Sequence, residues 1–197
     1  MIIKGNINVT WTEADYINLP WYTNEVHEEK FNATVDTSTY DVGVSICFED
    51  LPEVFQTIAN QFNLDKPVIA VNKLETGKIL PFHKDLFKSY RARNNIAERQ
   101  PITRIIVFLH KQKAGHQLWI EDTICIGDAG AFFGWTQNTV HMAANLGTEN
   151  RYILQITGCE KLYVKEPMHP SEGEMSLDST GEVVVYQLGN WVRNIFP

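Results

Sequence analysis

Residues 78–85 read Lys78-Ile79-Leu80-Pro81-Phe82-His83-Lys84-Asp85, an apolar run that ends in two side chains able to bind a metal ion. Successive side chains of a β-strand point to opposite faces, so His83 and Asp85 share one face. His141 follows 58 residues after His83, in the run Asn138-Thr139-Val140-His141-Met142. Two histidines and one carboxylate meeting from different strands would form a 2-His-1-carboxylate triad, which leaves one side of a metal ion open.

Arg151 follows His141 by ten residues and begins the strand-like run 151–157. A buried arginine requires an anionic partner, because an unpaired buried charge costs several kcal/mol. A dicarboxylate that chelates a metal ion at one end and meets a guanidinium at the other would satisfy both groups. Strand alternation puts Gln155 and Thr157 on the face of Arg151, where they either contact a ligand or fill the core.

Short β-rich runs separated by turn residues extend from Val68 to Gly158 and predict a sandwich or barrel. Strands are expected at 2–11, 42–48, 68–74, 79–85, 102–110, 116–121, 131–135, around His141, from Arg151, and at 183–188. A polar loop is expected at 166–181. One helix is expected at 51–62, with an apolar face at helical spacing, Asp50 as its N-cap and Glu53 completing a capping box.

The bulk composition is that of an ordinary globular protein, with 197 residues, 44% hydrophobic and 21% charged. This length predicts one domain over 1–197. The formal net charge of −7 argues against general binding to nucleic acid or to anionic membranes. No apolar run approaches the roughly 20 residues that a membrane span needs, and no signal peptide is expected. Three widely spaced cysteines suit a reducing compartment, so the predicted location is cytoplasmic.

The combination of His83-x-Asp85, distal His141 and Arg151 resembles the Fe(II)/2-oxoglutarate-dependent oxygenases. The flanking runs 74–77, 127–130 and 145–147 strengthen the resemblance, which covers about 68–158. It is similar in particular to small prolyl-hydroxylase-like and aspartyl/asparaginyl-hydroxylase-like members. The resemblance implies a mainly β, cupin-like jelly-roll, the double-stranded β-helix, with eight core strands and flanking helices on one sheet.

The resemblance also implies an activity. His83, Asp85 and His141 would hold Fe(II), and Arg151 would pair with the far carboxylate of 2-oxoglutarate. Oxygen would be consumed with release of succinate and carbon dioxide. The substrate would be a small molecule or a peptide, hydroxylated on an amino acid or a peptidyl side chain. Because the family's halogenases lack the carboxylate, Asp85 favours hydroxylation over halogenation.

Three further residues are candidate ligands of the cosubstrate: Asn72, Tyr90 and Thr157. The alternative for Asn72 is a locally bonded polar core position, and that for Thr157 is core filling. The segment 84–104 carries six basic residues and is either a substrate lid or a solvated loop. Two rival functions are a cupin-type metal enzyme that does not use 2-oxoglutarate, and a non-catalytic jelly-roll that binds a ligand.

Overall fold

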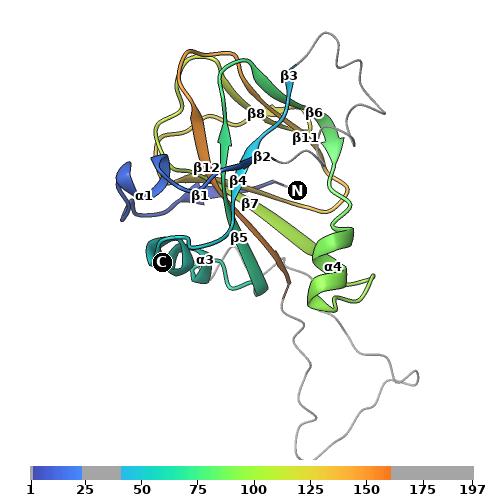
Figure 1. The fold of residues 1–197 in the computed structure, drawn as a ribbon. Coiled ribbons are helices and arrows are strands. Elements are labelled where there is room, and N and C mark those ends of the chain that lie inside the picture. The colour runs from blue at the N-terminus through green and yellow to red at the C-terminus, as the bar shows by residue number, and fades with distance from the viewer. Residues whose placement is uncertain (1, 24–40, 161–197) are drawn as a thin grey trace, which may run out of the picture. The chain divides into compact units, whose positions relative to one another are not determined.

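Two β-sheets, of seven and five strands, face one another in the computed structural model, which describes residues 2–23 and 41–160 (Figure 1). The elements in chain order are β1 (Ile3–Asn6), α1 (Ala14–Ile17), β2 (Tyr22–Thr23), β3 (Asp41–Val42), β4 (Ser45–Cys47), α3 (Glu53–Asn60), β5 (Asp65–Leu74), β6 (Lys78–Lys84), α4 (Lys88–Asn94), β7 (Ile102–Phe108), β8 (His116–Ile120), β9 (Thr123–Ile124), β10 (Ala131–Thr136), β11 (Val140–Asn145) and β12 (Arg151–Cys159).

The strand order identifies the architecture. The larger sheet contains the neighbours β10-β7-β12-β5, and the smaller one contains β6-β11-β8-β9. Between β5 and β12 the chain therefore crosses from one sheet to the other after almost every strand, and all pairs within these eight strands are antiparallel. Eight strands wound in this manner form a double-stranded β-helix, so the predicted fold class is confirmed.

Strand alternation separates two apolar layers. Ile106 and Phe108 of β7 point between the sheets, where they pack against Leu118 and Ile120 of the smaller sheet. The intervening side chains of the larger sheet point outward and are covered by the apolar face of α3 and by Tyr16 of α1 (Figure 1). Helices therefore cover the outer face of the larger sheet, and its inner face is left to line the interior.

The helix expected at 51–62 forms, but its N-terminus differs from the expectation. It begins at Glu53 with Pro52 as N-cap, and no side chain caps it. Asp50 has a left-handed φ of 52° instead, so the predicted capping box is wrong. Proline fixes its own φ near the value that a helix start needs and has no N–H to satisfy, which suits it to this end.

Several strands are shorter than expected, and helices α1 and α4 were not expected. The strand predicted at 2–11 covers only Ile3–Asn6, and that at 42–48 divides into β3 and β4. Helix α4 occupies the segment before β7 that the sequence marked only as polar. The strand and loop predicted within 161–197 lie outside the described residues.

Residues 1–160 cluster as one compact unit, and the single domain predicted over 1–197 stays a prediction. Within the described residues no helix combines the length and the apolar character that crossing a membrane requires.

Candidate metal-binding pocket

Three potential metal ligands converge between the sheets. His83 on β6 and His141 on β11 are direct register partners, with ring centroids 4.2 Å apart. Asp85 follows the last residue of β6, on the face of His83. One ligand atom from each of the three residues lies within 4.8 Å of the other two. His141 is buried, and His83 and Asp85 are partly exposed. The structure thus brings together the triad on which the sequence analysis rested.

Backbone contacts orient both imidazoles. Nδ1 of His83 lies 2.7 Å from the Pro81 carbonyl oxygen, and Nδ1 of His141 lies 3.0 Å from that of Thr139. A carbonyl oxygen only accepts, so each Nδ1 carries the proton and each Nε2 has a lone pair. Nε2 of His141 lies 3.3 Å from Asp85 Oδ2, and Nε2 of His83 lies 4.0 Å from Asp85 Oδ1. This is how backbone carbonyls fix histidine ligands at metal sites.

The electrostatics of the cluster favour a cation. Burial lowers the pKa of His141 to about 4, against the opposing attraction of Asp85, so the ring is neutral near pH 7. Neutral imidazole and ionised carboxylate are the forms that bind a metal. Lone pairs of two histidines and a carboxylate aimed at one point are a donor set that fits a divalent transition metal.

Sequence reasoning missed Arg104, which also reaches this cluster. It lies on β7, and its Nη1 is 2.7 Å from Asp85 Oδ2. Its guanidinium lies over the ring of Phe87, with Cζ 4.9 Å from the centroid. The signal was present in the sequence: Arg104 shares its strand face with Ile106 and Phe108, and a lone arginine on an otherwise apolar strand face requires a partner inside.

A cavity between the sheets contains all of these groups. The volume open to the centre of a water molecule is about 140 Å³, roughly ten times what one water needs. Its metal-ligating residues come from the smaller sheet and the loop after β6. Its other polar residues, Asn72, Arg104, Arg151 and Gln155, come from the larger sheet. Among the lining residues that the structure describes, Asp85 is the one acidic residue.

Arg151 begins β12 and points into this cavity, where it is 5% exposed. Its Cζ lies 5.5 Å from the ring centroid of Phe108. Within the described residues no carboxylate pairs with it, and its Nη2 has no hydrogen-bond partner. Burial lowers its pKa to about 10. A charged guanidinium in this state is a binding site for an anion.

Two more buried polar atoms of the cavity wall have no partner among the described residues: Nε1 of Trp135 and Oδ1 of Asn72. Trp135 also packs against His141, with ring centroids 4.5 Å apart. Native proteins satisfy nearly all buried polar groups. Two orphan donors, on Trp135 and Arg151, and one orphan acceptor on Asn72 line the same cavity, so the cavity is built to bind a polar ligand.

The three further candidate ligands lie in different places. Asn72 lines the cavity, but its Nδ2 donates to Gln155 Oε1 at 3.1 Å. Only its Oδ1 then faces the cavity, and this oxygen accepts hydrogen bonds, so it does not suit an anion. Thr157 does not line the cavity, and its hydroxyl oxygen accepts from Arg104 Nε at 3.4 Å. Tyr90 lies on α4 and donates to the Lys66 carbonyl oxygen at 2.9 Å, so the structure does not bring it to the cavity.

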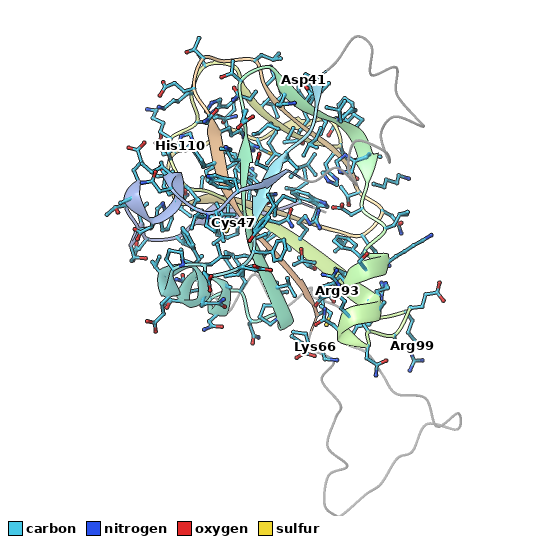
Figure 2. All side chains as sticks on the ribbon, in the orientation of Figure 1. Asp41, Cys47, Lys66, Arg93, Arg99 and His110 are labelled. Atoms are coloured by element: carbon cyan, nitrogen blue, oxygen red, sulfur yellow. The ribbon has the colours of Figure 1, made fainter. Side chains whose placement is uncertain are left out.

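The basic segment 84–104 divides into separate parts. Arg91 donates to the carbonyl oxygens of Ala97 and Gln100, and so holds the turn after α4. Arg93, on α4, and Arg99, in the turn that follows it, are both exposed (Figure 2). Arg104 alone among them lines the cavity.

Comparisons with known proteins were made with both sequence and structure. No protein-family model matches the sequence, and no curated protein matches it. Solved structures that resemble the chain include a prolyl-4-hydroxylase from Pseudomonas putida, with a TM-score of 0.48 and 11% identity over 75% of this chain and 96% of that one. A predicted oxalate decarboxylase from Thermotoga maritima has a TM-score of 0.39 and 14% identity over 60% and 82%. A cupin protein from Bacteroides fragilis has a TM-score of 0.35 and 14% identity over 56% and 79%.

The fold assignment rests on the strand order, and these similarities add no argument about activity. Fold and cavity together define a double-stranded β-helix protein with a His-Asp-His cluster that could bind a metal ion, beside a buried cationic site.

Proposed function

We propose that the chain is a non-haem Fe(II)- and 2-oxoglutarate-dependent dioxygenase that hydroxylates an amino acid or a peptidyl side chain and releases succinate and carbon dioxide. The observation that carries the proposal is the buried guanidinium of Arg151, which has no partner among the described residues and lines the same cavity as the triad. A metal site alone does not require such a group. A ligand with an acid at each end requires both the metal site and the guanidinium.

His83, Asp85 and His141 would hold the ion through two Nε2 lone pairs and one carboxylate oxygen. Bound Fe(II) supplies the redox chemistry that couples decarboxylation of the oxo acid by oxygen to oxidation of a substrate C–H bond. Three protein ligands would leave part of the ion open to the oxo acid. The bonds from Nδ1 to Pro81 and Thr139 keep both imidazoles oriented before any ligand arrives.

Arg151 would bind the distal carboxylate of 2-oxoglutarate. A charge-assisted pair in a dry cavity contributes more than one in water, because little solvent competes with it. Trp135 Nε1 provides a second donor in the same wall. Asn72 Oδ1, as an acceptor, suits an N–H or O–H of the substrate and not a carboxylate. The apolar lining excludes water from the reacting groups.

The test measures oxygen-dependent succinate formation from 2-oxoglutarate by the Fe(II)-loaded full chain, with and without a panel of amino acids and peptides. His141→Ala should abolish succinate formation, whereas Arg99→Gln, an exposed charge change, should leave it unchanged. Metal binding without consumption of 2-oxoglutarate under any condition would overturn the proposal and favour a cupin-type metal enzyme. Equal succinate formation by His141→Ala and the parent would also overturn it.

A further inference from the structure

Arg104 is held in a fixed position with part of its guanidinium unused. Nη1 contacts Asp85 Oδ2 at 2.7 Å, and Nε lies 3.4 Å from the hydroxyl oxygen of Thr157. The group also lies over the ring of Phe87. Among the described residues no other hydrogen-bond partner contacts it, which leaves Nη2 available. Its side chain is 18% exposed and lines the cavity. A guanidinium stacked on an aromatic ring is pre-organised for planar recognition of a carboxylate.

Arg104 and Arg151 stand at opposite ends of the cavity wall. Arg104 is the register partner of Thr157 on β12, six residues along that strand from Arg151. At about 3.4 Å per residue, roughly 20 Å separates the two backbone positions. Arg104 touches the triad through Asp85, whereas the Arg151 guanidinium lies over the ring of Phe108. A small dianion that runs from the triad to Arg151 therefore extends away from Arg104, whose guanidinium can meet a second molecule that approaches the triad.

The charges of the cavity also leave one anion to be supplied. Two guanidinium groups face one carboxylate, and both histidines donate as neutral ligands. A divalent ion adds two positive charges, and a 2-oxoglutarate dianion cancels them. One uncompensated positive charge remains, and the Arg104 side chain is only 18% exposed, so little water reaches this cation. A substrate with one negative charge would restore neutrality.

We propose that Arg104 binds a carboxylate of the substrate, which makes the substrate an acid: a free amino acid held by its α-carboxylate, or an aspartyl or glutamyl side chain. Calling this acid the substrate rests on the proposed function, but the carboxylate site itself does not depend on 2-oxoglutarate. Arg104 is then a specificity-determining residue, whose unused Nη2 meets the incoming acid while Nη1 stays on Asp85.

The rival explanation gives Arg104 a positioning role alone, in which it only orients Asp85 toward the metal. The two explanations differ in what a neutral substitution changes. Loss of a positioning residue weakens metal binding and affects every substrate equally. Loss of a carboxylate-binding residue affects acids and spares their amides.

The experiment uses the full chain loaded with Zn(II) and 2-oxoglutarate, which binds without turnover. The probes are the twenty L-amino acids, each beside its α-carboxamide, and N-acetyl-aspartyl amide beside N-acetyl-asparaginyl amide. Binding is detected by ligand-observed NMR, and the tightest pair is titrated against the parent, Arg104→Gln and Arg104→Lys. Arg93→Gln, at an exposed position of α4, is the matched control for loss of one positive charge. Zn(II) affinity is measured for every variant.

The expected result is that the parent and Arg93→Gln bind the acid about 10- to 100-fold more tightly than its amide. Arg104→Gln should lose this preference, and Arg104→Lys should keep part of it. An equal weakening of acid and amide that follows a loss of Zn(II) affinity would overturn the inference in favour of positioning. A parent that binds none of the acids would overturn it too. If 2-oxoglutarate fails to bind while the acid preference persists on the Zn(II) form, the proposed function fails and the carboxylate site stands.

Discussion

Replacing Arg151 with methionine should make the ligand-free protein more stable, although it removes a buried side chain of the cavity. Burial, with no anion beside it among the described residues, lowers the pKa of Arg151 to about 10. At 1.36 kcal/mol per pKa unit, burial disfavours the charged form by roughly 3 kcal/mol. Methionine is neutral, of similar length, and able to fill the same space.

Two losses reduce this gain. The guanidinium lies over Phe108, a contact worth about 0.5–1 kcal/mol, and imperfect packing of the new side chain costs about 1 kcal/mol more. The expected net change is an increase of about 1–2 kcal/mol in the free energy of unfolding, or roughly 2–8 °C in Tm for a chain of this size. Arg99→Met is the control, because Arg99 is exposed and its replacement should change stability by less than about 0.5 kcal/mol.

The assay is urea denaturation and thermal melting, each with and without Mn(II) and 2-oxoglutarate. The parent should gain about 2.7 kcal/mol when the oxo acid is present at 100 times its dissociation constant, and Arg151→Met should gain little from it. A variant at least 1 kcal/mol less stable than the parent without ligand would show that the guanidinium already has a stabilising partner. An undiminished response to 2-oxoglutarate would remove Arg151 from its binding site.

Three other outcomes follow from the described contacts. His141→Ala should lower Zn(II) affinity by at least about 100-fold in calorimetric titration, since a direct ligand matters more than its outer partners; an unchanged affinity would exclude it as a ligand. Gly115→Ala should lower the free energy of unfolding by about 2–4 kcal/mol, because φ is +86° and a Cβ there would lie 2.2 Å from Gly147 N. Gly77→Ala is the matched control: φ is +82° but the space around it is open, so the expected loss is about 1 kcal/mol. Equal losses in urea melts would contradict this. Burial lowers the pKa of His116, so the unfolded chain takes up a proton at this residue at a higher pH than the folded chain does. The free energy of unfolding should therefore be at its full value above about pH 6.5 and should fall below that pH. Urea melts at pH 7.5 and 5.5 should show a shallower fall for His116→Gln, and parallel falls would refute it.

The triad could be found from sequence because its geometry depends on simple periods. His83 and Asp85 are two residues apart at the end of one apolar run, so strand alternation alone places them on a common face. That His141 meets them depends on the pairing of β6 with β11, which no local pattern specifies. The family resemblance supplied this pairing, and the sheet topology now shows it. Arg104 ends a segment rich in basic residues, and this local charge obscures its place on the otherwise apolar face of β7.

Helix α4 shows a different kind of failure. Its sequence, Lys88-Ser89-Tyr90-Arg91-Ala92-Arg93-Asn94, has no apolar period, and no residue in it is buried. Arg91 instead fixes the loop that follows, by donating to the carbonyl oxygens of Ala97 and Gln100, and the chain leaves the helix through Asn95 in a left-handed conformation. Helices held by side-chain bonds to a neighbouring loop carry no hydrophobic periodicity to detect.

The division of the cavity between the two sheets supports the proposal of a ligand with two ends. The smaller sheet and the loop after β6 supply every metal ligand, and the larger sheet supplies both arginines and both orphan polar atoms beside Arg151. Sheets packed face to face stand about 10 Å apart. Arg104 and Trp135 of the larger sheet reach across to Asp85 and His141, whereas Arg151 lies over Phe108 of its own sheet. A lone metal ion would leave Arg151 unpaired, and a simple anion at Arg151 would leave the triad empty. The proposed 2-oxoglutarate, with a chelating group at one end and an acid at the other, would satisfy both walls with a single ligand.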